Sequence, residues 1–133
     1  MIDLDGVLAE FNQSFASEVG VPPAMMKQKG WPFKWNWPED YLEAVKLEAV
    51  WDKIRRSRNF WEGLPEFSWT RPTLDLLWDS AAEGHEVYFV TSREGDDAKR
   101  QTERWLGKKG FPMPTVLVSS HGDKAGIAHD LDA

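Results

Sequence analysis

The sequence predicts an α/β fold built on a parallel sheet, and three observations carry this prediction. From about residue 72 onward, segments with helical spacing alternate with short runs of β-branched and aromatic residues. This alternation is typical of a parallel sheet that is covered by helices. The chain has 133 residues, enough for one compact domain or a small core with a subdomain. Its 41% apolar and 29% charged residues are an ordinary globular balance.

In the N-terminal half we expect one strand and two helices. Residues 1–4 are predicted as a short strand. A helix over about residues 8–19 is indicated by apolar side chains at near-helical spacing, with Gly20 as its stop. These side chains are Leu8, Phe11, Phe15 and Val19. Residues 29–38 are predicted as a loop broken by glycine and proline, and a second helix is predicted over about 38–58.

In the C-terminal half, helices and strands are expected to alternate. Proline suits the first turn of a helix, glycine marks helix ends, and β-branched and aromatic runs favour strands. The predicted elements are a helix from Pro72 to about Gly84, a strand over 86–90, a helix over 96–109 that stops at Gly110, a strand over 115–119 and a short helix over 123–133.

Residues 12–71 are interpreted as an insertion between the first strand and the rest of the sheet. The predicted organisation is a core formed by residues 1–11 and 72–133, with a helical, aromatic-rich cap formed by residues 12–71. Five of the eight tryptophans lie between residues 31 and 61. These large rings can fill the thin core of a small subdomain or form the wall of a pocket, and the sequence leaves both readings open.

Charge and composition argue against several classes of function. The net charge of −6 disfavours polynucleotide binding, which needs a basic footprint. The absence of cysteine excludes disulfide and thiol chemistry, and a cytoplasmic location is expected. No signal peptide and no membrane-spanning run is recognisable. The arginines near the end of the second expected helix, Arg55, Arg56 and Arg58, are interpreted as solvated charges that complement the helix dipole rather than as an anion site.

Polar side chains follow each predicted strand. They are Asp3 and Asp5 after the first, Thr91, Ser92 and Arg93 after the second, and Ser119, Ser120, His121 and then Lys124 after the third. In open parallel sheets, ligands bind beyond the carboxyl ends of the strands. Carboxylates can hold a hard cation such as Mg²⁺, while hydroxyl and ammonium groups can bind phosphate oxygens. The sequence therefore predicts a site for a small phosphorylated substrate.

Three stretches, in this order, resemble the motifs of the haloacid dehalogenase (HAD) superfamily of phosphohydrolases. "DLDGV" at 3–7 is similar to its first motif, "VYFVTSR" at 87–93 to its second, and Lys124 within "SSHGDKAGI" to its third. "DLDGVLAEF", "NFWEGLPEF" and "FVTSR" look like the 5′(3′)-deoxyribonucleotidase branch, including its bacterial and phage-type relatives. The resemblance implies a Rossmann-like three-layer α/β/α core, with a helical cap inserted after the first strand.

The same resemblance implies a Mg²⁺-dependent phosphatase of the 5′-nucleotidase kind that acts on (deoxy)nucleoside monophosphates. Asp3 would be the nucleophile that forms an aspartyl-phosphate, and Asp5 would act first as general acid and then as base. Thr91 would hold a phosphate oxygen, and Lys124 would hold both the nucleophile and the phosphate. Mg²⁺ would be bound by the Asp3 carboxylate and by the Asp5 backbone carbonyl.

Further residues are expected to bind the substrate. Gly6 would let the backbone approach the phosphate, and Ser92 and Arg93 would lie near it. Phe11 and Trp61 are expected to contact the base or the sugar, because aromatic faces suit a nucleobase.

The chain departs from the family pattern at the fourth motif, a strand that ends in acids and completes the Mg²⁺ shell. Only "AGIAHDLDA" follows Lys124, and no hydrophobic strand leads to Asp130 or Asp132. We therefore expect a fragment or a shortened member, with weakened Mg²⁺ binding and turnover. The first strand would be an open sheet edge, at which a second copy of the chain could pair to form a homodimer.

Three other readings compete with a phosphatase. A serine–histidine–acid triad from Ser119 or Ser120 lacks a nucleophile elbow. A zinc site from His121, His129 and Asp130 lacks a matching spacing. A non-catalytic module that binds a nucleotide or a protein through its aromatic cap is the more serious alternative, and the missing fourth motif favours it.

Overall fold

The structure is built around a small parallel sheet, as the sequence predicts. The computed structural model describes residues 1–32, 34 and 36–119. Strands β1 (Tyr88–Thr91) and β2 (Thr115–Val118) pair in parallel along their whole length. Both are rich in β-branched and aromatic residues, which pack well on a pleated surface. The α/β class is thus confirmed, whereas the described residues do not form a complete three-layer core.

The N-terminal segment lies on the other side of β1. The Ile2 amide donates to the Tyr88 carbonyl at 2.7 Å, and the Val90 amide donates to the Ile2 carbonyl at 2.9 Å. The predicted strand over residues 1–4 is wrong in length, because only Ile2 bridges to β1. Beyond Ile2 the chain folds back, and the Leu4 carbonyl accepts hydrogen bonds from the amides of residues 7, 8 and 9.

The helices match the predicted order, with one unexpected short turn at α2. Their bounds are α1, Phe11–Val19; α2, Pro23–Met26; α3, Ala44–Arg56; α4, Thr70–Ala82; and α5, Ala98–Lys109. The glycines expected to stop α1 and α5 adopt left-handed backbones, with φ of 96° at Gly20 and 118° at Gly110. The helix predicted over 123–133 lies outside the described residues.

The helix predicted over 38–58 is wrong in its first part. A 3₁₀ turn, η1 (Trp37–Asp40), comes first, and α3 begins only after Glu43, whose backbone is extended with ψ of 156°. Trp37 is buried, and its indole N–H donates to the Asn12 side chain of α1. This anchor holds η1 against α1, so tertiary packing overrides the local helical propensity.

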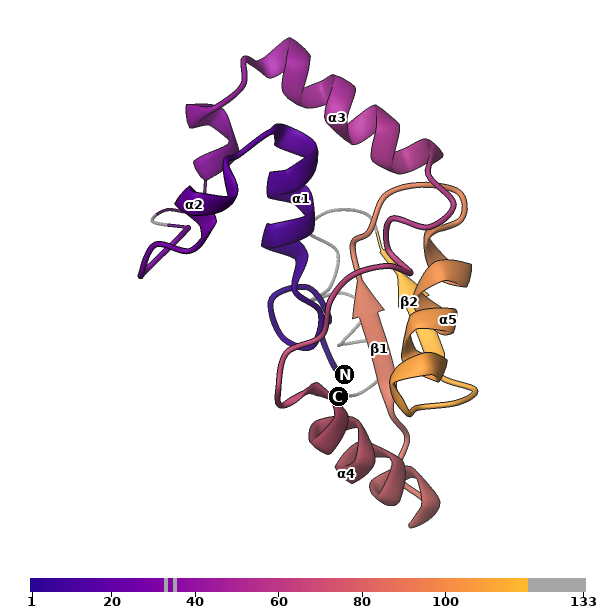
Figure 1. Cartoon of the computed structure of the whole chain (residues 1–133). Coiled ribbons are helices and arrows are strands. Elements are labelled where there is room, and N and C mark those ends of the chain that lie inside the picture. Colours follow the sequence, from indigo (N-terminus) through magenta and orange to yellow (C-terminus); the bar gives the residue numbers. More distant parts are fainter. Residues whose placement is uncertain (33, 35, 120–133) are drawn as a thin grey trace.

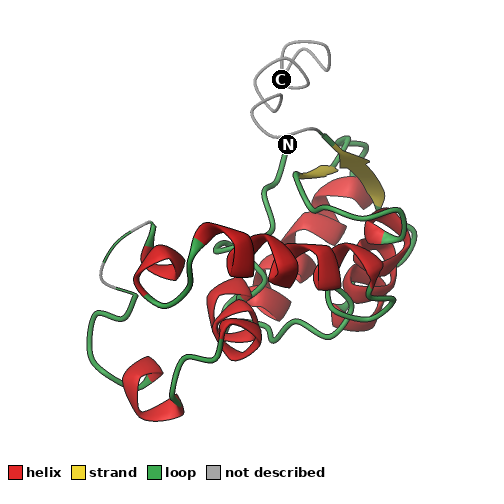
Figure 2. Ribbon diagram, turned by 90° about the horizontal axis from the view of Figure 1, so that it is seen from above, coloured by secondary structure: helices red, strands yellow, loops and turns green. Residues whose placement is uncertain are grey.

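One cluster of buried apolar side chains joins both halves of the chain. It includes Phe15 of α1 and Ile54 of α3 together with Leu74 of α4, Phe89 of β1 and Trp105 of α5. Helix α5 packs against β2 and α4, whereas α1 contacts α2 and α3 (Figure 1). Helix α2 lies far from the strands (Figure 1), and the view from above shows the strands at one end of the molecule with short helical segments at the other (Figure 2). Within the described residues, no helix has both the length and the apolar character needed to cross a membrane.

Candidate functional site

The residues that follow the N-terminal segment, β1 and β2 come together at one edge of the sheet. The Ser119 amide donates to the Thr91 carbonyl at 2.8 Å, so the two strand ends lie side by side. Beyond them, the hydroxyl oxygens of Ser92 and Ser119 are 3.4 Å apart. The Ile2 bridge brings the first acidic loop to the same edge. The residues that follow the strands therefore converge at one edge of the sheet, as expected from parallel strands.

A cavity of about 1510 Å³ opens at this edge and extends beneath the aromatic residues of α1, η1 and α3. Seven of the predicted site residues line it: Asp3, Asp5, Gly6, Phe11, Trp61, Ser92 and Arg93. Thr91 is buried beside it without lining it, and Lys124 lies outside the described residues. The cavity is large enough for a ligand of mononucleotide size.

Asp5 forms an ion pair with Arg93 at the cavity wall. Arg93 Nη2 lies 2.9 Å from Asp5 Oδ1, and Nε lies 3.3 Å from both carboxylate oxygens. The Arg93 side chain is inaccessible to solvent, whereas that of Asp5 is 27% exposed. Arg93 also donates to Thr102 Oγ1 at 2.9 Å and lies 5.0 Å from the centre of the Trp61 ring. Its guanidinium group is thus committed to contacts within the protein.

The loop that carries the two acids is tightly turned. The Leu4 amide donates to Asp3 Oδ1 at 2.8 Å, which orients the Asp3 carboxylate. Gly6 has φ of +79° and its amide donates to the Ala9 carbonyl. A side chain would disfavour this backbone conformation, so glycine allows the turn that presents Asp3 and Asp5 to the cavity.

Thr91 carries a buried hydroxyl that nothing in the described chain satisfies. The residue is 1% exposed, and its Oγ1 has no hydrogen-bond partner among the described residues. An unsatisfied buried polar group costs about 1–3 kcal/mol, so such groups usually indicate a ligand, a water or an ion. Thr91 is the second-motif residue expected to hold a phosphate oxygen.

An aromatic cluster forms part of the cavity wall. Phe11 stacks on Phe15 at 5.1 Å between ring centres, on Trp61 at 5.8 Å and on Trp51 at 6.1 Å. These rings belong to the buried core or pack against it, and they also line the cavity. The sequence left open whether the tryptophans fill a core or form a pocket wall. Trp51 and Trp61 do both.

Two further residues that line the cavity carry no sequence signal of function. Asn12 is the second residue of α1, and Arg55 lies near the end of α3. Arg55 Nε lies 3.3 Å from Glu94 Oε2, which joins α3 to the loop after β1. Gly95 lies in this loop with φ of +116°, and a Cβ atom there would stand 2.7 Å from the Arg55 carbonyl oxygen. Only glycine permits so close an approach between the two segments.

Gly95→Ala is expected to destabilise the fold by about 3 kcal/mol, because it adds a steric clash with the α3 backbone to the strain of a left-handed residue. Gly84→Ala is the matched control, since Gly84 has φ of +100° but a Cβ atom added there would meet no other atom within 4 Å. It should cost about 1–2 kcal/mol from backbone strain alone. Urea denaturation measures both, and equal losses would contradict the close contact.

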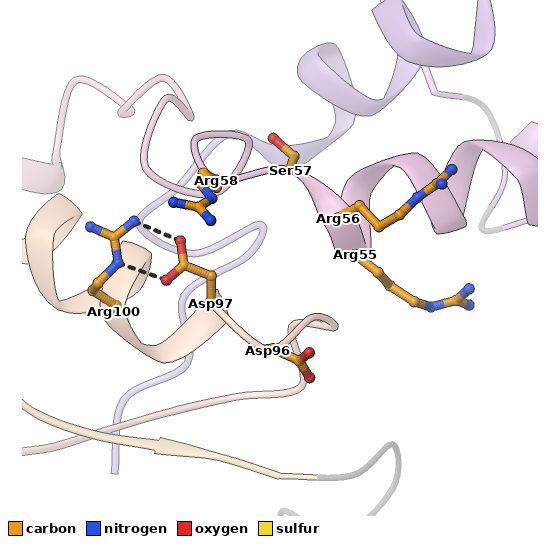
Figure 3. A pocket seen from close by; sticks show the side chains of 7 residues that line it. All are labelled: Arg55, Arg56, Ser57, Arg58, Asp96, Asp97 and Arg100. Carbon is orange, nitrogen blue, oxygen red and sulfur yellow. Dashed lines mark hydrogen bonds and ion pairs between the residues drawn. The ribbon is translucent and has the colours of Figure 1, made fainter.

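A second pocket, of about 510 Å³, lies where the end of α3 meets the loop before α5 (Figure 3). Its lining residues are Arg55, Arg56, Ser57, Arg58, Asp96, Asp97 and Arg100. Arg100 donates to the two Asp97 oxygens at 2.6 and 2.7 Å, and these bonds hold the pKa of Asp97 below its ordinary value. The Arg55 and Arg56 side chains point away from this pair. Arg58 and Arg100 lie on the Asp97 side of the pocket (Figure 3), so the four guanidinium groups do not meet at one point, which favours surface charges over an anion site.

Asp97→Asn is expected to lower the melting temperature at pH 7, and its difference from the unaltered chain should shrink as the pH is lowered below 3.8. The pKa of Asp97 is lowered from 3.8 in the folded chain by the hydrogen bond from Arg100. Ionised Asp97 therefore stabilises the fold fully above 3.8, and this contribution is lost as pH falls through the lowered pKa. Asp96→Asn, from the same pocket, is the control and should shift the melting temperature less. A loss that is independent of pH would contradict this prediction.

Comparisons with known proteins give a partial match. No protein-family model matches the chain, and no solved structure matches it. The chain is 38% identical over 40 residues to a Bacillus cereus protein named "Putative nucleotidase". The matched stretch is 30% of this chain and 21% of that protein, so the chain covers about a fifth of the relative's length. This match indicates a nucleotidase-like relationship over that stretch.

Proposed function

We propose that this chain is a phosphomonoester hydrolase of the HAD type that acts on (deoxy)nucleoside monophosphates through an aspartyl-phosphate. The observation that carries the proposal is that Asp3 and Asp5 line the same cavity as a wall of stacked aromatic rings. The cavity therefore offers both carboxylates for phosphoryl chemistry and flat apolar faces for a base. The short stretch of sequence similarity to a protein named "Putative nucleotidase" supports the same function.

Asp3 is proposed as the nucleophile. Its carboxylate oxygen attacks phosphorus, a P–O bond to the enzyme forms, and the bond to the substrate's leaving oxygen breaks. The hydrogen bond from the Leu4 amide holds the carboxylate in one orientation, which favours attack along a fixed line. Splitting hydrolysis into formation and breakdown of this intermediate replaces one difficult step with two easier ones.

Asp5 is proposed as the general acid and base. In the first step Asp5 must be in its neutral carboxylic acid form, and it gives that proton to the leaving oxygen; the carboxylate that remains takes a proton from water in the second step. The pair with Arg93 uses mainly Oδ1, at 2.9 Å from Nη2, whereas Oδ2 has one longer contact of 3.3 Å to Nε. We assign the proton transfers to Oδ2, while the bond to Oδ1 keeps the carboxylate in place.

The phosphate is proposed to bind between the two strand ends and the acidic loop. Thr91 Oγ1 would donate to a phosphate oxygen, which would satisfy the hydroxyl that is otherwise buried without a partner among the described residues. Ser92 lines the cavity next to it and supplies a second hydroxyl. The role of Lys124 as a phosphate and nucleophile partner rests on the resemblance alone, since the residue lies outside the described chain.

Magnesium is a proposal that the described residues fit only in part. No group of three or more potential ligands comes together among them, but Mg²⁺ is often held by one or two carboxylates with water and substrate phosphate completing the shell. Asp3 and the Asp5 backbone carbonyl would hold it. When bound, Mg²⁺ neutralises charge on the phosphate and on the nucleophile, so that the two anions can approach.

Phosphate release from a panel of substrates tests the proposal directly. The panel holds deoxynucleoside and nucleoside monophosphates and sugar phosphates, each assayed with Mg²⁺ and with excess EDTA. We expect release from nucleoside monophosphates that exceeds release from sugar phosphates and depends on Mg²⁺. Release from sugar phosphates alone would refute the substrate class, and release in EDTA would refute the metal.

A non-catalytic binding module is the second candidate, because the buried Arg93 pairs with Asp5 and holds part of its carboxylate. In that case the same nucleotides would quench the fluorescence of the cavity tryptophans, Trp37, Trp51 and Trp61, without any release of phosphate. The two measurements on one sample therefore separate the catalyst from the binding module.

A further inference from the structure

Asn12 lies in the cavity wall with its side-chain amide held in one orientation. Trp37 Nε1 lies 3.2 Å from Asn12 Oδ1. An indole N–H can only donate a hydrogen bond, so the amide oxygen must be the atom that faces Trp37. The NH₂ group of the same planar amide is therefore directed away from the indole.

The partner of Asn12 is itself firmly placed. Trp37 is 5% exposed; its ring packs edge-on against Phe15 at 5.8 Å and tilted against Trp31 at 5.2 Å between ring centres. An indole held in this way cannot follow a rotating amide, so flipping Asn12 would place its NH₂ group against an N–H donor. The orientation of the amide is thus set by packing that is already present without a ligand.

The NH₂ group of Asn12 has no acceptor within the described chain, although the residue is half-buried and lines the cavity. A pre-oriented donor in the wall of a ligand-sized cavity is the arrangement that gives specificity to otherwise apolar sites.

We propose that Asn12 is a specificity-determining residue, whose NH₂ group donates a hydrogen bond to an acceptor atom on the organic part of the ligand. The acceptor would be a ring carbonyl oxygen or a pyridine-type ring nitrogen. Asn12 adjoins Phe11, which lines the same cavity as Asp3 and Asp5, so a ring on the aromatic wall can meet the amide while its phosphate meets the acids. The inference rests on the proposed function and adds a recognition contact to it.

The test compares binding of two phosphates: deoxyuridine 5′-monophosphate (dUMP), which has two ring carbonyls and a deoxyribose, and phenyl phosphate, which has neither a ring acceptor nor a sugar. Tryptophan fluorescence titration gives the dissociation constants. Every protein carries Asp3→Asn, so that no ligand is consumed. In this background Asn12→Leu is expected to weaken dUMP binding about fivefold, the size of one neutral hydrogen bond, and to leave phenyl phosphate within twofold.

Asn12→Asp is the matched variant, because it keeps an oxygen for the Trp37 indole but replaces the NH₂ group with a second acceptor. It should weaken both ligands through charge repulsion with phosphate, and dUMP by a further factor of about five or more. Equal weakening of both ligands in both variants would mean that Asn12 only supports Trp37, and unchanged or undetectable dUMP binding would equally overturn the inference.

Phosphate release by the chain with native Asp3 is measured in parallel. Its absence would refute the proposed hydrolysis without affecting the comparison of dissociation constants, since binding to the Asp3→Asn chain requires no turnover. Normal release with no effect of Asn12 on selectivity would refute the Asn12 inference alone.

Discussion

Phosphate release is expected to fall at least about 10³-fold when Asp3 is replaced by asparagine, the scale of loss when a covalent catalyst is deprived of its nucleophile. An amide oxygen is a poor nucleophile toward phosphorus, so no aspartyl-phosphate forms. The fold should be unaffected, because the asparagine oxygen can still accept the hydrogen bond from the Leu4 amide. Single-turnover phosphate release with the best substrate measures the loss, and thermal melting checks the fold.

Glu10→Gln is the control for this prediction. Glu10 follows the same acidic loop and caps α1 by accepting a hydrogen bond from the Gln13 amide, but it does not line the cavity. The glutamine removes one negative charge nearby and retains the capping oxygen, so activity should stay within about twofold. If Asp3→Asn keeps a tenth or more of the activity, or if Glu10→Gln loses as much as Asp3→Asn, the assignment of the nucleophile is wrong.

The sheet could be predicted because the residue types within each strand favour β-structure by themselves. Runs such as "VYFV" are β-branched and aromatic with turn residues on both sides, and the structure places β1 and β2 within two residues of the predicted bounds. The first strand was not predictable in length, because hydrogen bonds to the Leu4 carbonyl turn the chain back after Ile2. That competition depends on Gly6 and on packing around it, which no window of propensities describes.

The sequence predicts which residues follow the strands and therefore share one edge of the sheet. It does not predict which of these residues contact each other. Parallel strands bring their carboxyl ends to one edge whatever the intervening sequence, so Asp3, Asp5 and Ser92 could be grouped in advance. The ion pair of Asp5 with Arg93 spans 88 residues, and the bond of Trp37 to Asn12 spans 25. Such contacts depend on how segments that are distant in the sequence pack together, and the spacing of residues carries no signal for them.

Arg93→Met is expected to destabilise the fold by about 3 kcal/mol, because the fully buried guanidinium group makes charge-assisted and neutral hydrogen bonds that methionine cannot make. Methionine fills much of the volume of the side chain, so the loss reports the guanidinium contacts to Asp5, Thr102 and Trp61 rather than a large cavity. Arg100→Met is the control, since its pair with Asp97 lies at the surface and should matter far less. Urea denaturation measures both changes, and equal losses would contradict the prediction.

A double-mutant cycle then separates the Asp5–Arg93 pair from the other contacts of Arg93. Asp5→Asn alone should also destabilise the fold, because it leaves a buried guanidinium group with Thr102 and Trp61 as its remaining partners. The double variant should lose less than the sum of the single losses, by about 1–3 kcal/mol. Additive losses would show that the two charges do not stabilise each other. Because Asp5 holds Arg93 in the fold as well as facing the cavity, variants of Asp5 mix stability with activity, and Asp3 remains the cleaner position at which to test catalysis.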